Sequence, residues 1–186
     1  MRTVILGVLG TVGLLASCGA VLGGCAAKPL SSNERTAMAS EAQVALDDLE
    51  KVHPGVRRRM ESAYAYAIFP RVTKGAAIVG GAKGDGLVYE RGRLIGNVTL
   101  TQASVGAQIG GSSFRELILF QDRRALQRLI DGRMEVDARA QAVAGESGGV
   151  AANDYDDGVR VYTATVGGLI LDASIGGQDF SYLPID

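Results

Sequence analysis

The sequence is poor in the residues that build metal centres, disulfides and acid–base sites. It contains one histidine, His53, no tryptophan, and two cysteines, Cys18 and Cys25, which both lie near the N-terminus. The rest of the chain therefore offers no disulfide framework and no thiol metal site. We expect no metal, no cofactor and no enzyme activity, since one histidine leaves little for acid–base chemistry.

A net excess of charge is also missing. The formal net charge of the 186-residue chain is -1, which gives no reason to expect a nucleic acid as partner. The distribution is uneven, however. Residues 51–93 contain nine bases and three acids, whereas residues 141–186 contain one base, Arg160, and seven acids. A protein with one basic region can approach an anionic surface through it while staying soluble overall.

The first 25 residues are typical of an exported bacterial protein. A short positive start is followed by apolar residues 4–16, a length that suits a signal peptide. The sequence LGGC at 22–25 then resembles the lipobox of bacterial lipoproteins, which implies cleavage before Cys25 and acyl chains on that residue. We therefore predict a signal peptide at 1–24, a lipidated tether at 25–32 and one domain over 33–186. Ala26, where an aspartate would mark inner-membrane retention, favours an outer-membrane anchor facing the periplasm of a Gram-negative cell.

Two other interpretations of the N-terminus stay open. The sequence LASC at 15–18 also fits a lipobox, with Cys18 as the acylated residue, although LGGC is the closer match. Residues 4–27 are uncharged and long enough to span a bilayer as an uncleaved helix. Their many glycines and the small residues before Cys25 argue against this second reading.

Helix signals occur near both ends of the domain. Ser31 and Glu34 have the spacing of a capping box, and an apolar stripe behind them predicts a helix over 33–52. Pro54 suits a new helix start, followed by a short basic helix over 56–63. Asp122 caps a further predicted helix that Gly132 ends, and we expect residues 134–144 to be helical as well.

Between and after these helices the pattern predicts strands. Large and small residues alternate over 64–69, Pro70 is expected to end that strand, and residues 83–86 and 91–93 are expected to form turns. Short strands joined by tight turns argue for an α+β domain with a glycine-rich, curved antiparallel sheet and flanking helices. The other predicted strands cover residues 75–82, 87–90, 94–100, 103–109, 116–121, 159–166, 169–174 and 180–183.

Two motifs suggest chemistry but lack the required context. The sequence GESGG at 145–149 matches the G-x-S-x-G of hydrolases around Ser147, yet the only histidine lies upstream and no strand-to-helix turn is predicted there. We interpret it as a chance match. The acidic residues Asp154, Asp156 and Asp157 resemble a calcium loop with two ligand positions wrong, so a solvated acidic turn is the simpler interpretation.

The basic region is the better candidate for a site. Arg57 and Arg58 lie in the short basic helix, Arg71 and Lys74 flank the expected turn after Pro70, and Lys83 lies at an expected hairpin tip. If the sheet brings these ends together, the five side chains would form a phosphate-binding surface. Ordinary solvated charge is the alternative, and the sequence leaves both open.

Several spaced motifs resemble those of the SYLF-domain family over roughly residues 35 to 183. They are AYAIFPRVTKG at 65–75 followed by IVGG and GDG, ASVGAQIGG at 103–111, and YTATVGG at 162–168 followed by AS at 173–174. SYLF domains occur in eukaryotic endocytic proteins and in bacterial lipoproteins, and eukaryotic members bind phosphoinositides. The resemblance implies a non-enzymatic module that binds anionic lipids.

From this resemblance and the leader we expect a membrane-anchored lipoprotein whose SYLF-like domain binds anionic phospholipid head groups through Arg57, Arg58, Arg71, Lys74 and Lys83. The alternative is an envelope scaffold or assembly factor that binds a protein partner, because the basic half could face an acidic surface. A hydrolase using Ser147 is a third hypothesis, for which we expect no activity.

Overall fold

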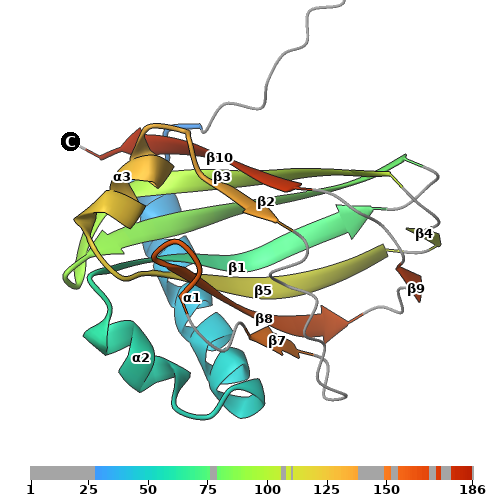
Figure 1. Ribbon diagram of the computed structural model, residues 1–186, viewed down its shortest axis with the longest axis horizontal. Coiled ribbons are helices and arrows are strands. Elements are labelled where there is room, and N and C mark those ends of the chain that lie inside the picture. Colours follow the sequence, from blue (N-terminus) through green and yellow to red (C-terminus); the bar gives the residue numbers. More distant parts are fainter. Residues whose placement is uncertain are drawn as a thin grey trace, which may run out of the picture.

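The computed structural model describes residues 28–75, 79–105, 108–109, 111–137, 149–151, 155–167, 171–172 and 177–185. The predicted leader, with Cys18 and Cys25, lies outside the described residues, as do Ser147 and Asp154. In the described part, three helices flank a curved antiparallel sheet, which confirms the predicted α+β class (Figure 1).

The three helices begin where the sequence signals predict. They are α1 (Ser32–Val52), α2 (Val56–Ser62) and α3 (Arg123–Ile130). Ser31 and Glu34 form the reciprocal capping box of α1, in which the Ser31 N–H donates to the Glu34 carboxylate at 2.7 Å. The Asp122 carboxylate accepts the Ala125 N–H at 2.9 Å and so satisfies a free donor at the start of α3.

Eight strands form the main sheet in the spatial order β6-β10-β3-β2-β1-β5-β8-β7, and β4 and β9 form a two-stranded ladder. All pairings are antiparallel, as short connections between successive strands favour. The strands are β1 (Ala65–Gly75), β2 (Val79–Glu90), β3 (Arg93–Val105), β4 (Gln108–Ile109), β5 (Gly111–Phe120), β6 (Glu135–Asp137), β7 (Gly149–Ala151), β8 (Val159–Gly167), β9 (Leu171–Asp172) and β10 (Gly177–Pro184).

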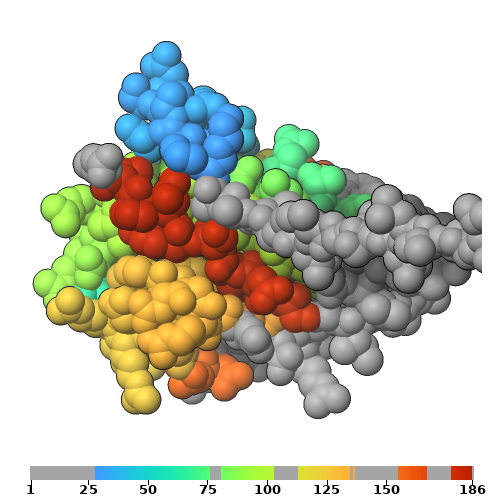
Figure 2. Space-filling model, turned by 90° about the horizontal axis from the view of Figure 1, so that it is seen from above, coloured from blue at the N-terminus to red at the C-terminus, as the bar shows by residue number. Residues whose placement is uncertain are grey.

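The two faces of the sheet bury separate apolar cores. Helix α1 packs Leu46 and Leu49 against one face, where they meet Leu117 of β5. We call this the helix-covered face. The opposite, inner face carries Phe69 and Phe180, and α3 packs against it. In Figure 2, β10 lies between the start of α1 and α3, so it borders both layers. Because the buried apolar residues lie between positions 42 and 180, a chain that starts at Lys28 keeps both cores.

Strand β1 does not end at Pro70, contrary to the prediction. It continues to Gly75 through a bulge, at which the register with β2 shifts between Ile68 and Arg71. Proline is tolerated at a bulge because no ladder hydrogen bond from its nitrogen is needed there. The partner strand needs Gly86 at this point, since a Cβ on Gly86 would lie 2.6 Å from the Ile68 carbonyl oxygen.

Three other element predictions were wrong. Residues 83–86 lie inside β2 and form no turn, because their glycines allow close backbone approach to β1. The predicted strands at 94–100 and 103–109 are largely one strand, β3, which spans Arg93–Val105. Residues 135–137, predicted as helix, form β6 and pair with β10. Residues 149–151, for which no strand was predicted, form β7 and pair with β8.

None of the described helices is both long enough and apolar enough to cross a membrane.

Candidate functional site

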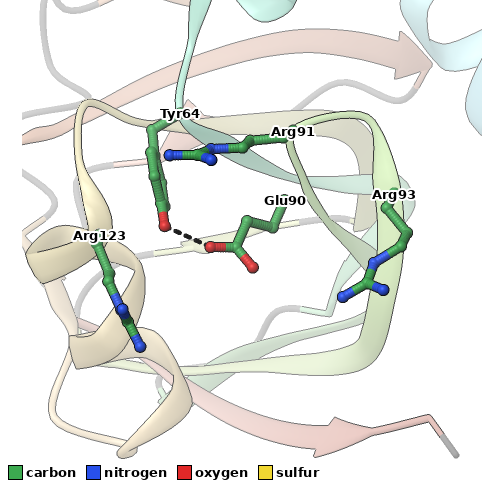
Figure 3. A pocket seen from close by; sticks show the side chains of 5 residues that line it. All are labelled: Tyr64, Glu90, Arg91, Arg93 and Arg123. Atoms are coloured by element: carbon green, nitrogen blue, oxygen red, sulfur yellow. Dashed lines mark hydrogen bonds between the residues drawn. The ribbon is translucent and has the colours of Figure 1, made fainter.

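A pocket of about 570 Å³ opens where three chain segments meet at one end of the sheet. Tyr64 precedes β1, Glu90, Arg91 and Arg93 belong to the β2–β3 hairpin, and Arg123 begins α3. Figure 3 shows these side chains around a shared opening, with Arg93 and Arg123 on opposite sides and Glu90 between them. We call this site the arginine pocket.

The hairpin that carries two of the arginines has a two-residue turn. Arg91 has φ 51° and Gly92 has φ 77°, and Glu90 pairs with Arg93 across the turn. Two positive φ angles define the turn type whose twist matches that of the flanking strands. This geometry places one arginine in the turn and another at the first position of β3.

Backbone hydrogen bonds bring the other two segments to this hairpin. The Arg91 N–H donates to the Tyr64 carbonyl at 3.1 Å, and the Tyr64 N–H donates to the Phe120 carbonyl at 3.1 Å. Phe120 ends β5, three residues before Arg123. The cap formed by Asp122 then starts α3, so Arg123 is held beside Tyr64 by two short connections.

Inside the pocket, Tyr64 is the hub of the contacts. Its hydroxyl donates to Oε1 of Glu90, and the Arg91 guanidinium lies 5.1 Å from the centre of its ring. The hydrogen bond to Glu90, together with burial, raises the pKa of Tyr64, while Arg91 and Arg123 act in the opposite direction. Tyr64 therefore keeps its proton at neutral pH and remains a donor.

No carboxylate of the described residues forms an ion pair with the three pocket guanidiniums, in contrast to several arginines elsewhere in the domain. Other arginines in the described segments are paired across elements or within loops: Arg57 with Asp47, Arg115 with Asp48, Arg128 with Asp157 and Arg133 with Asp131. Arg91, Arg93 and Arg123 are exposed, so they are free to turn toward a ligand. Guanidiniums and a phenolic hydroxyl together are suited to bind an anion with several oxygens.

The structure separates the five basic residues named from the sequence. Arg57 and Arg58 lie on α2, where the Arg57 guanidinium is 2.5 Å from an Asp47 oxygen. Arg71, Lys74 and Lys83 lie in the second half of β1 and the first half of β2. The five side chains therefore come from two regions of the domain.

The strand residues are themselves divided between the two faces. Arg71 pairs with Asp85, and Lys83 lies two residues along β2 on the same, helix-covered face. The predicted hairpin-tip position of Lys83 was wrong, because the residue lies within β2 opposite Thr73. Successive side chains of β1 point to opposite faces of the sheet. Lys74 therefore lies on the inner face, like Val72, whereas Arg71 and Thr73 lie on the helix-covered face. Arg71 and Lys83 therefore share one face with Asp85, whose carboxylate accepts the Thr99 hydroxyl at 2.7 Å.

His53 directly follows the helix predicted over 33–52, and it is the residue that caps the C-terminal end of α1. Its Nε2 lies 2.8 Å from the Thr163 carbonyl oxygen, and its ring packs edge-on against Tyr162 at 5.3 Å between centroids. Of the acidic loop, Asp157 is described and pairs with Arg128. His53 and Asp157 thus have structural partners in the fold.

Sequence reasoning recognised residues 91–93 as a turn but did not identify the arginine pocket. Two arginines around a glycine at a hairpin tip, and an arginine directly after a helix cap, were the available local signals. Neither signal says that the two places meet, since this depends on the pairing of β1 with both β2 and β5.

No protein-family profile matches the chain. Among curated proteins, it is similar to Beta cell expansion factor A of Aeromonas veronii, with 28% identical residues over 149 aligned positions. The alignment covers 78% of this chain and 56% of the relative, so the chain spans little more than half the length of that protein. Most of this chain thus has a distant bacterial relative.

Proposed function

We propose that this chain is a membrane-anchored bacterial lipoprotein with a SYLF-like domain that binds anionic phospholipid head groups without catalysis. The observation that carries the proposal is the arginine pocket, in which three guanidiniums without carboxylate partners line one opening together with the Tyr64 side chain. Charge-assisted hydrogen bonds from guanidiniums to phosphate are among the strongest polar contacts in proteins. The lipobox at Cys25 and the SYLF-like motifs supply the membrane context.

The start of the domain lies close enough to the pocket for both to reach one membrane surface. The buried Asn97 side chain donates to the Lys28 carbonyl at 2.9 Å, which holds the end of the tether against β3. Asn97 is four residues from Arg93 along that strand, or about 13 Å. Lys28 is the third residue after Cys25, and such a segment spans at most about 10 Å. An acylated Cys25 would thus keep the arginine pocket within about 25 Å of the bilayer.

A second contact with the membrane is available to the residues named from the sequence. Arg58, Arg71 and Lys83 are exposed, and none of them forms an ion pair within the described residues. They would add long-range attraction to an anionic surface, which salt screens. We assign the specific head-group contact to the arginine pocket because its donors line one opening.

The proposal is tested by sedimenting the domain from Lys28 onward with vesicles of defined composition across a salt series. We expect salt-sensitive binding to vesicles containing anionic phospholipid and none to phosphatidylcholine alone. The double variant Arg93→Gln/Arg123→Gln should weaken binding at least tenfold, since each charged contact contributes roughly 1.5–3 kcal/mol. Arg91 is left intact because its positive φ belongs to the turn.

Two matched variants decide where the lipid binds. Arg124→Gln changes the neighbouring exposed residue of α3, which does not line the pocket, and should bind like the parent domain. The triple variant Arg58→Gln/Arg71→Gln/Lys83→Gln should reduce binding less than the pocket variant does. If only the triple variant loses binding, the pocket assignment is wrong. If the parent domain binds no vesicle at all, the lipid proposal fails, and the alternative of a scaffold with a protein partner gains support.

A further inference from the structure

We propose that the arginine pocket selects phosphomonoesters over phosphodiesters, and that Glu90 is the internal acceptor that the ligand displaces from Tyr64. This inference rests on the proposed function and narrows its ligand class. Phosphodiester head groups have one negative charge and two free oxygens, whereas a terminal phosphate has three free oxygens and up to two charges. The pocket has features that distinguish the two classes both by the number of free oxygens and by charge.

The number of donors fits a terminal phosphate. Arg91 lies over the Tyr64 ring, Arg93 starts β3 and Arg123 starts α3, so the guanidiniums border the opening from three sides, and each long side chain could turn toward a ligand between them (Figure 3). Three free oxygens can each accept from a different guanidinium. A diester has an ester bond in place of one of these oxygens, which leaves one arginine without an acceptor.

The charge of the pocket also fits a dianion. Three guanidiniums and the Glu90 carboxylate leave two positive charges among the lining residues. The Asp122 carboxylate accepts the Ala125 N–H at the start of α3 and is not among the residues that line the pocket. A dianionic phosphate balances the pocket, while a monoanionic diester leaves one positive charge uncompensated.

The Glu90 carboxylate accepts the hydrogen bond that we assign to the ligand. It lies between Arg93 and Arg123 in Figure 3 and accepts the Tyr64 hydroxyl, yet it forms no ion pair with any of the three described arginines. A phosphate among the guanidiniums would repel this carboxylate. The Tyr64 hydroxyl would then donate its hydrogen bond to the phosphate instead of to Glu90. Glu90 therefore lowers affinity for every anion and penalises those too weakly charged to displace it.

The test compares vesicles of phosphatidylcholine containing phosphatidate, a phosphomonoester, with vesicles containing phosphatidylglycerol, a phosphodiester. Lipid fractions are adjusted to equal surface potential, so that general attraction is the same in both. We expect the domain from Lys28 onward to bind the phosphatidate vesicles about tenfold more tightly, as one extra charged contact predicts. Equal binding to both would overturn the inference while leaving the lipid proposal intact.

Variants separate the pocket from general charge. Glu90→Gln should tighten binding to both lipids, with a gain of about tenfold for the diester, and so reduce the preference. Arg93→Gln/Arg123→Gln should lose the preference, and Arg124→Gln should keep it. A thermal melt of each variant checks folding. A preference that survives in the pocket double variant contradicts the assignment.

Soluble ligands distinguish a lipid head group from free phosphate chemistry. Calorimetric titration with glycerol 3-phosphate and with dimethyl phosphate should give binding only to the former, weakened by Arg93→Gln/Arg123→Gln. If no vesicle is bound but glycerol 3-phosphate is, the lipid proposal fails and phosphomonoester selection stands. If neither glycerol 3-phosphate nor phosphatidate is bound, the inference is wrong.

Discussion

The Gln178 side chain donates its amide N–H to Oε2 of Glu116 at 3.0 Å inside the inner face of the sheet. Gln178 lies on β10 and Glu116 on β5, and three strands separate them in the sheet order. Their contact shows how strongly the sheet curves. Both side chains are fully buried, and Oε1 of Glu116 and the amide oxygen of Gln178 have no hydrogen-bond partner among the described residues. Burial raises the pKa of Glu116 to about 7, so a protonated acid is the form that this site favours.

The free energy of unfolding should therefore fall as the pH rises from the ordinary pKa of Glu116 to its raised pKa in the fold. The ordinary pKa of a glutamate, which applies in the unfolded chain, is 4.5, and in the fold the pKa of Glu116 is about 7. Between these two pH values Glu116 is protonated in the folded chain and ionised in the unfolded chain. The free energy of unfolding should then decrease from pH 4.5 to pH 7, by on the order of 3 kcal/mol, and level off above. Urea titrations at several pH values measure this change.

The matched variant is Glu116→Gln, which keeps a donor and an acceptor but cannot ionise. It should remove most of the loss between pH 5 and 7 and make the domain more stable than the parent at pH 8. Carboxylates with a lowered pKa, such as Glu50, which accepts the N–H groups of Arg57 and Gly55, act below this range. An unchanged slope in Glu116→Gln would show that another group controls the dependence.

A second prediction concerns the contact that joins α1 to the bulge. The Arg115 Nε donates to Asp48 of α1 at 2.8 Å, and its Nη1 donates to the Pro70 carbonyl at 2.9 Å. The Arg115 side chain is 12% exposed, so its removal leaves two acceptors poorly solvated. Arg115→Ala should lower the free energy of unfolding by about 3 kcal/mol. Arg133→Ala, which breaks an exposed pair with Asp131, should cost less than about 1 kcal/mol in the same titration.

Gly86 should not tolerate a side chain. A Cβ at this position would lie 2.6 Å from the Ile68 carbonyl oxygen and 2.7 Å from a ring carbon of Phe69. Gly86→Ala should destabilise the domain by about 2–3 kcal/mol, because the bulge and the inner core must shift. Gly75→Ala is the control, since its Cβ would meet no atom within 4 Å. Similar melting temperatures for the two variants would contradict this account of the bulge.

Anchoring is tested in cells. If Cys25 is the acylated residue, Cys25→Ser should move the protein from the membrane fraction to the soluble fraction or block its processing, while Cys18→Ser should not. Fractionation and mass measurement of the mature N-terminus read this out. Loss of anchoring in Cys18→Ser alone would assign the lipid to that residue.

These features also show which parts of the molecule local sequence signals could predict. The capping box at Ser31, the cap at Asp122 and the helix end at His53 depend on residues a few positions apart, and all three were predicted correctly. The fold class followed from strand alternation and turn residues. The pairing of β2 with β1 was not visible, so the glycines around Lys83 were interpreted as a turn, although they allow close strand approach.

The candidate site was harder to predict for the same reason. Tyr64, Arg93 and Arg123 are distant in sequence and meet only because β1 pairs with β2 on one side and β5 on the other. Basic residues that are close together in the sequence, such as Arg57 and Arg58, were predicted as site residues instead. The pocket is defined by donors from three segments that line one opening, rather than by donors that are close together in the sequence.

The most direct test of the central claim is to observe the arginine side chains while a phosphomonoester binds. Guanidinium NMR signals of the domain from Lys28 onward are followed during titration with glycerol 3-phosphate. The account predicts that the signals of Arg91, Arg93 and Arg123 shift together and saturate, while those of Arg57 and Arg128, which are paired with aspartates, stay in place. Saturable shifts at Arg58 and Arg71 with none in the pocket would contradict it.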